Sequence, residues 1–157
     1  MAEIFLSTQI ESDIQTVFDL SRSIELHLES TKHTGEVAIA GVTTGLIGLN
    51  EEVTWQARHL FKQRRFTSRI TVMQAPNYFC DEMKQGDFKE FLHEHFFEAN
   101  ERGTLMKDRI LLEAPYGILG KLVTAVFLKN YIKSFVEERN KAIKDYAEKG
   151  TWQKILA

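Results

Sequence analysis

Hydrophobic and polar residues alternate with a period of two over most of the chain between residues 51 and 114. Five segments carry this period, and turn-rich or polar pieces separate them: residues 51–61, 66–75, 78–85, 88–99 and 104–114. Consecutive segments joined by such short connections are expected to pair as hairpins. The pattern therefore predicts an antiparallel meander of five strands, with one face toward a core and the other toward solvent.

The period is helical in two other parts of the chain. A further strand candidate, residues 2–10, is followed by Ser12 and Asp13, which are typical helix-capping residues, and then by apolar positions at helical spacing. These positions predict two short helices. Residues 119–149 contain no proline and present one apolar side, which predicts a single long helix, bent or straight. The fold class is α+β, with the long C-terminal helix covering the apolar face of the sheet.

Strand periodicity also predicts which side chains share the covered face, because a slip of one residue would reverse them all. We expect Phe61 to face Phe66, Asp81 to lie opposite His93, and Asp108 to lie opposite His95. The covered face then carries Trp55, Ala57, His59, Phe61, Phe66, Ile70, Val72, Phe79, Met83, Phe91, Phe97, Met106, Ile110 and Leu112.

Five polar residues point to the same face as these apolar side chains: His59, Asp81, His93, His95 and Asp108. Charged groups that leave water need a partner, so each of them should be paired. The expected register offers Asp81 with His93 and Asp108 with His95 as cross-strand pairs.

Composition and charge exclude several classes of protein. A chain of 157 residues is expected to form one domain, residues 1–157, and its net charge of −2 argues against a nucleic-acid partner. No apolar run is long enough to cross a bilayer, and we see no signal peptide. The single cysteine, Cys80, is expected to be a structural thiol on the outward face. These features favour a cytoplasmic protein.

Several stretches of the chain are similar to a known superfamily. They are FCDEM at residues 79–83, GDF at 86–88, FLHEHFF at 91–97, GTLMKD at 103–108 and APYGILG at 114–120. With the order of elements, they resemble the START-like, or SRPBCC, superfamily, and within it the bacterial polyketide cyclase-like group. The resemblance implies the helix-grip fold of birch-pollen-allergen-type proteins, in which a curved sheet grips a long helix around a ligand cavity. Members bind lipids, sterols, polyketides and other apolar molecules, and some are aromatases or cyclases.

The inward histidines and aspartates have three interpretations within such a fold. His93 and His95 form a His-x-His motif that places both imidazoles on one face of a strand, as metal sites require. The same residues could form two His–Asp pairs at the polar end of a cavity, which we prefer, and we assign no metal or cofactor. A His with a carboxylate partner is also suited to acid–base catalysis.

The sequence therefore supports three hypotheses. The first is a binding protein for a hydrophobic or amphipathic small molecule, with contacts from Trp55, His59, Phe61, Ile70, Phe79, Asp81, Met83, Phe91, His93, His95, Phe97, Met106, Asp108, Ile110 and Leu112. The second is a cyclase or aromatase that uses His93 and His95 as acid or base, with Asp81 and Asp108 fixing their tautomers. The third is an interacting subunit. We expect a monomer or homodimer, and the glycine-containing loop at residues 41–48 is either a lid or an irregular connection.

Overall fold

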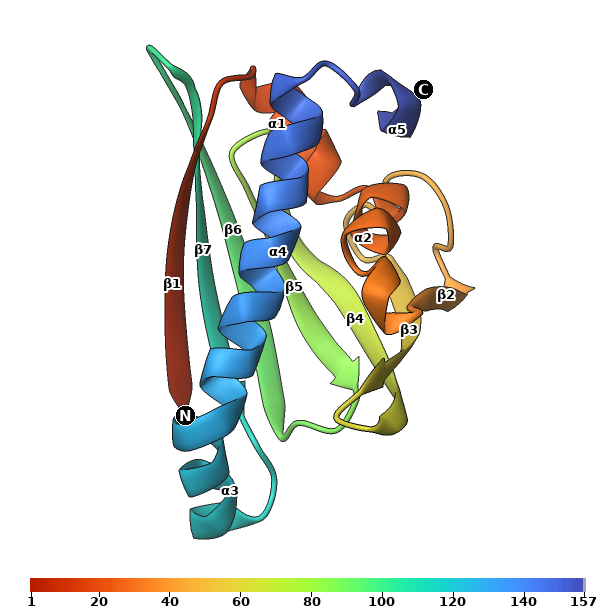
Figure 1. Ribbon diagram of the computed structural model, residues 1–157, viewed down its shortest axis with the longest axis vertical. Coiled ribbons are helices and arrows are strands. Elements are labelled where there is room, and N and C mark those ends of the chain that lie inside the picture. Colours follow the sequence, from red (N-terminus) through yellow and green to blue (C-terminus); the bar gives the residue numbers. More distant parts are fainter. Residues whose placement is uncertain (157) are drawn as a thin grey trace.

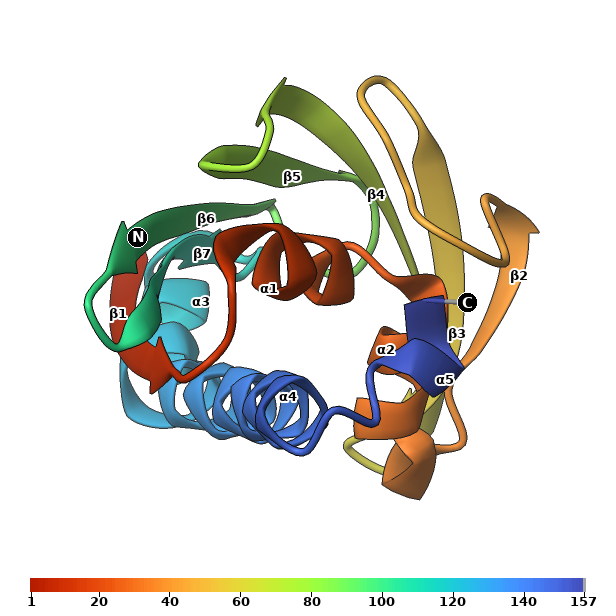
Figure 2. The ribbon, with the colours of Figure 1, turned by 90° about the horizontal axis from the view of Figure 1, so that it is seen from above.

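A seven-stranded antiparallel sheet curves around one side of a long helix in the computed structural model (Figures 1 and 2). The structure describes residues 1–156, and of residue 124 it describes only the backbone. The strand order is β1-β7-β6-β5-β4-β3-β2. The strands are β1 (Ala2–Ile10), β2 (Val37–Gly41), β3 (Glu52–His59), β4 (Lys62–Gln74), β5 (Tyr78–Gln85), β6 (Glu90–Asn100) and β7 (Gly103–Glu113). The predicted α+β fold class is confirmed.

Two short helices follow the first strand, as predicted, and the remaining helices follow the last strand. The helices are α1 (Ile14–Ser21), α2 (Ile24–Ser30), α3 (Gly117–Val123), α4 (Lys129–Glu148) and α5 (Gln153–Leu156), with a 3-10 turn at Lys32–Thr34. Asp13 caps α1 by accepting a hydrogen bond from the backbone N–H of Thr16 at 3.0 Å. Ser23 caps α2 in the same way through the N–H of Leu26.

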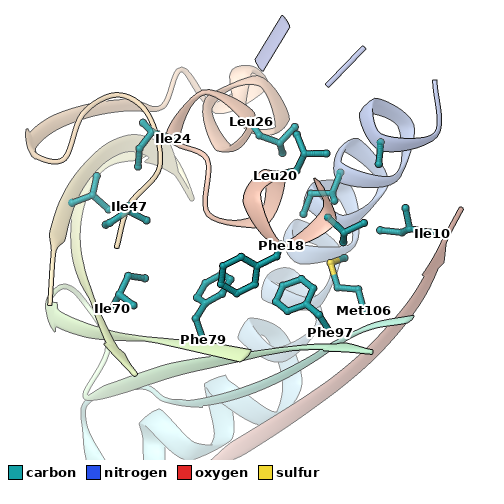
Figure 3. Close-up of a cluster of buried hydrophobic side chains, with 14 of the residues drawn as sticks. Ile10, Phe18, Leu20, Ile24, Leu26, Ile47, Ile70, Phe79, Phe97 and Met106 are labelled. Carbon is teal, nitrogen blue, oxygen red and sulfur yellow. The ribbon is translucent and has the colours of Figure 1, made fainter. Parts of the chain in front are cut away.

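The main core lies where α1 is inserted between the sheet and α4, with α2 beside it (Figures 2 and 3). The Phe18 ring of α1 meets the rings of Phe79 and Phe97 edge to face, with centroids 5.6 and 5.3 Å apart. Ile143 of α4 is completely buried in the same cluster. A smaller cluster, which includes Ile4 and Val136, packs β1 and β7 against α4.

The predicted strand register is correct in one half of the sheet and wrong in the other. Asp81 pairs with His93, and His95 pairs with Asp108, as expected. Between β3 and β4, however, His59 pairs with Lys62 through a two-residue turn, so Phe61 stands at the turn and is 96% exposed instead of facing Phe66. A β-bulge in β4 after Ile70 turns Val72 outward, which corrects its predicted inward position.

The predicted C-terminal helix is three helical sections in succession. A π-helical segment, Thr124–Leu128, separates α3 from α4. Figure 1 shows α3 beyond the ends of β1 and β7, where no strand faces it. Leu122 and Val126, expected on the covered side, are therefore exposed. None of the helices described in residues 1–156 is long and apolar enough to cross a membrane.

Candidate functional site

A cavity of about 700 Å³ separates strands β3 to β6 from α4. This volume lies within the range of small-molecule sites. Much of the wall is aromatic, with contributions from the sheet and the helix: Trp55, Phe66, Phe79, Phe91, Tyr131 and Phe135. The wall also includes Ile47, from the loop at residues 41–48. That loop is fixed to the start of α2 by hydrogen bonds from Ile24 N–H to the Gly45 carbonyl and from Gly45 N–H to the Glu25 carboxylate.

The structure divides the predicted ligand-binding residues into a wall group and a group outside the wall. The residues on the cavity wall are Trp55, His59, Ile70, Phe79, Asp81, Phe91, His93 and His95. Phe97, Met106, Ile110 and Leu112 are buried in the packed clusters instead. Asp108 is buried behind the histidines, Met83 is not part of the wall, and Phe61 is at the exposed turn.

His93 and His95 each hydrogen-bond to an aspartate at the inner end of the cavity. His93 Nε2 lies 2.7 Å from Asp108 Oδ1, and His95 Nε2 lies 2.6 Å from Asp81 Oδ2. The shortest contacts thus exchange the expected partners, because each imidazole reaches diagonally through Nε2, but His95 Nδ1 also lies 3.5 Å from Asp108 Oδ1, the partner expected for it. The two imidazole rings stack with centroids 3.7 Å apart.

Two residues of α4 complete this cluster, and sequence analysis did not assign them to the site. Asn140 Nδ2 donates to Asp108 Oδ2 at 2.7 Å, and Arg139 donates to Asn140 Oδ1 at 2.8 Å. Arg139 Nη2 also donates to the Ser21 carbonyl and lies 3.4 Å from His95 Nδ1. The sequence did hold one indication that Arg139 belongs to the site, because it stands among apolar residues on the inner side of the predicted helix. We call Asp81, His93, His95, Asp108, Arg139 and Asn140 the polar cluster.

Burial and pairing shift the pKa values within the polar cluster. Burial raises the pKa of Asp108, but hydrogen bonds from both histidines and the charge of Arg139 outweigh it and hold this pKa well below its usual value. For Asp81, burial is likewise outweighed by the hydrogen bond from His95, so its pKa is lowered. Burial, reinforced by the neighbouring His95, lowers the pKa of His93 to about 4. His93 is therefore neutral at pH 7.

The two aspartates differ in their access to the cavity. The Asp108 side chain is 0% exposed, whereas that of Asp81 is 19% exposed and lies on the wall. Among the described residues, Asp81 Oδ1 and His93 Nδ1 have no recorded hydrogen-bond partner. Both atoms can accept a hydrogen bond at the cavity wall. Nδ1 is the acceptor of His93 because the neutral ring donates through Nε2 to Asp108.

Asp81, His93 and His95 are also the residues best placed to hold a metal ion, since their ligand atoms lie within 4.8 Å of one another. A cation bound there would compete with the His95–Asp81 hydrogen bond and would lie near the positive charge of Arg139. Stacked imidazoles also do not direct their lone pairs toward one point. The geometry therefore favours hydrogen bonding over metal binding.

A second polar group, also missed by sequence analysis apart from His59, lies on the wall near β2 and β3. His27 Nε2 is 3.1 Å from Glu36 Oε2, and the His27 ring stacks on Trp55 with centroids 4.0 Å apart. Burial raises the pKa of Glu36, but the His27 hydrogen bond and charge outweigh it, so the pKa is lowered. His59 Nδ1 lies 2.7 Å from the Tyr131 hydroxyl and links β3 to α4 across the cavity.

Cys80 stands between Phe79 and Asp81, which line the cavity, and its own side chain is buried. Burial raises the pKa of its thiol to about 11, so it is not a thiolate at neutral pH. This agrees with the predicted structural role and gives no reason to assign it to the site.

Comparison with known proteins gives a clear result only for structure. No protein-family model matches the chain, and no curated protein matches it. A START superfamily protein from Mycobacterium smegmatis aligns over 94% of this chain and 97% of its own, with 12% identity and a TM-score of 0.70. Major latex-like protein 151 from Panax ginseng aligns over 93% and 97%, with 14% identity and a TM-score of 0.69. A Staphylococcus aureus protein of unknown function aligns over 96% and 95%, with 12% identity and a TM-score of 0.72. At these identities the similarity shows the fold alone, and the predicted helix-grip fold is confirmed.

Proposed function

We propose that this chain binds a hydrophobic or amphipathic small molecule, of lipid-, polyketide- or aromatic-like character, between the sheet and the C-terminal helix. The observation that carries the proposal is an aromatic-walled cavity with one buried polar cluster at its inner end. Apolar walls supply most of the affinity for such ligands, and a few placed polar groups fix their orientation. Its START-like fold supports the same conclusion.

The polar cluster restricts the chemistry of the ligand's inner end. Asp81 Oδ1 and His93 Nδ1 both accept hydrogen bonds, so the ligand should present a donor there, such as a phenol, an alcohol or an amine. A hydrogen bond to a charged carboxylate contributes about 1.5–3 kcal/mol, which is about tenfold or more in affinity. An ether or ester oxygen at that position would meet two acceptors and gain nothing.

The test uses two probes that differ in one donor. We would titrate the protein with 2-naphthol and with 2-methoxynaphthalene and follow binding by calorimetry. Wild-type protein should prefer 2-naphthol by about tenfold. Asp81→Ala should lose this preference, whereas Asp87→Ala, which removes an exposed carboxylate of the cavity rim, should retain it. Failure of wild-type protein to bind either probe would overturn the proposal, and a preference that survives Asp81→Ala would overturn the role of Asp81.

A second candidate function, cyclase- or aromatase-type catalysis, rests on the accessible Nδ1 of His93. A neutral imidazole there could take a proton from a substrate carbon or hydroxyl next to a carbonyl. Asp108 at Nε2 would then hold the imidazolium until the proton returns, which offsets part of the burial that lowers the pKa of His93 to about 4 and makes it a weak base in the free protein. His93→Gln should abolish turnover of a polyketide-like substrate while its affinity changes little. Undiminished turnover in that variant would exclude this mechanism.

A further inference from the structure

The helical segment that precedes α4 presents an apolar surface to solvent. Ile118, Leu122 and Val126 lie four residues apart, on one side of α3 and the π-helical segment, and are 88%, 61% and 69% exposed. Large aliphatic side chains with this exposure, repeated over two turns, form a continuous apolar stripe rather than scattered surface residues.

A second apolar protrusion belongs to the β3–β4 turn. Leu60 and Phe61 both have positive φ, 52° and 65°, a conformation that two-residue hairpins fill most readily with Asn and Gly. Phe61 is 96% exposed. This turn therefore holds a large aromatic residue in solvent, in a backbone conformation that does not favour it.

The turn and the helical segment border the same cavity mouth. Leu60 contributes to the cavity wall together with Leu119, Val123 and Phe127, which form the neighbouring stripe of the same helical segment. The His59–Tyr131 hydrogen bond holds the end of β3 against the start of α4. We call Leu60, Phe61, Ile118, Leu122 and Val126 the mouth surface.

Basic residues flank the mouth surface, although the chain as a whole is acidic. Residues 114–136 include Lys121, Lys129 and Lys133 but no aspartate or glutamate. The β3–β4 hairpin adds Arg58, Lys62, Arg64 and Arg65 between residues 58 and 65, again without an acidic residue. Arg64 pairs with Asp87 at 2.6 Å, and the net charge of the whole chain is −2. The positive charge is thus concentrated where the apolar side chains are exposed.

We propose that the mouth surface docks on an anionic lipid bilayer, with its apolar side chains at the boundary between headgroups and acyl chains. Exposed apolar residues flanked by lysine and arginine suit this interface, because the basic side chains are attracted to the anionic headgroups while the apolar ones enter the acyl boundary. Docking would place the cavity mouth against the lipid, so that an apolar ligand could enter without crossing water. The docking residues are distinct from the polar cluster, so this proposal can fail or succeed independently of the ligand chemistry above.

The test is flotation of the purified protein with phosphatidylcholine vesicles that contain or lack phosphatidylglycerol. Wild-type protein should float with the anionic vesicles, and added salt should release it. The double variant Leu60→Asn with Phe61→Gly should bind at least about tenfold more weakly, because it removes two apolar contacts. It should fold at least as well as wild type, because Asn-Gly suits this turn. Ile118→Ser with Leu122→Ser should weaken binding similarly.

Phe5→Ser is the matched control, since Phe5 is 66% exposed on β1 and lies outside the mouth surface. It should float like wild type, and so should Asp81→Ala, which separates docking from ligand recognition. No flotation of wild-type protein, or an equal loss in Phe5→Ser, would overturn the proposal. A concentration-dependent dimer in sedimentation that Ile118→Ser with Leu122→Ser abolishes, without flotation of wild type, would instead assign the surface to a second copy of this chain.

Discussion

The two halves of α4 meet the rest of the molecule in different ways. Toward its C-terminal end, Ile143 and Ala147 are buried in the main core with Phe18 and Phe97. Toward its N-terminal end, Tyr131 and Phe135 face the cavity. Figure 2 shows that α1 lies between the sheet and α4 and that α2 lies beside it. One end of the helix is therefore packed and contributes stability, whereas the other leaves room for a ligand.

The polar cluster lies between these two regions and has features of both. Asp108 and Asn140 are buried and tie β7 to α4, whereas Asp81 and His93 face the cavity. The same set of hydrogen bonds thus joins sheet and helix on one side and, in the function proposed above, recognises the ligand on the other. Four predictions, in order of decreasing expected effect, test this division.

The largest contrast is expected between two phenylalanines of β6. Phe97→Ala removes a ring from the packed core and should lower the free energy of unfolding by about 3–5 kcal/mol. Phe91→Ala removes a ring that already borders an open space, so the free energy of unfolding should fall by about half as much or less. Urea denaturation of the two variants measures both values. Equal losses would contradict the distinction between packed and hollow ends.

The two aspartates of the polar cluster should also differ. Asp108→Asn removes a buried charge beside Arg139, and its amide oxygen can replace only one of the two carboxylate acceptors that bind His93 and Asn140, so we expect a loss of about 3 kcal/mol. Asp81→Asn affects a partly exposed group and should cost about 1–2 kcal/mol. Thermal unfolding at neutral pH compares them. A larger loss for Asp81→Asn would mean that the cavity-facing pair, not the enclosed one, holds the sheet to α4.

Stability should fall as the pH is lowered from about 6.5 to about 4. In this range an unfolded histidine binds a proton, but His93 in the folded protein, with a pKa of about 4, does not. Unfolding therefore takes up a proton, and acid favours it by at most about 3 kcal/mol for this residue. The lowered pKa values of Asp81 and Asp108 add further acid destabilisation below about pH 4.

Urea denaturation at several pH values measures this dependence. His93→Gln should flatten the decline between pH 6.5 and 4, whereas His33→Gln, at an exposed position, should not. If wild-type and His93→Gln proteins lose stability in parallel, His93 is not the group that resists protonation.

The smallest effect is expected at the link across the cavity. Tyr131→Phe removes the hydroxyl that lies 2.7 Å from His59 but leaves the aromatic ring, so the free energy of unfolding should fall by about 0.5–1.5 kcal/mol. Exchange of bound 2-naphthol, followed by stopped-flow fluorescence, should become faster because β3 and α4 are less firmly joined. Unchanged exchange would show that this hydrogen bond does not limit access.

Much of the fold could be predicted because its signals are local. The limits of β1 and β5 and the pairing of β5, β6 and β7 follow from alternation and clear turn residues. The β3–β4 register could not be predicted, because Leu60 and Phe61 form the turn without the glycine or asparagine that usually marks it. The bulge near Val72 likewise has no signal in the pattern.

The site was predictable only as a set of inward polar residues. Alternation placed Asp81, His93, His95 and Asp108 on one face, but the partners depend on how each side chain reaches diagonally across the sheet. Arg139 and Asn140 join from a helix far along the chain, and His27 with Glu36 from another region. Contacts of this kind depend on tertiary packing, which a single sequence does not specify.

The most direct test of ligand binding in the cavity is to weigh the protein incubated with 2-naphthol, under native conditions and again after denaturation. We predict one molecule of the probe per folded chain, released on unfolding. Ser68→Leu, which extends a buried wall residue into the cavity, should retain markedly less. A native wild-type protein that carries no probe, or a Ser68→Leu variant that carries as much as wild type, would contradict the account.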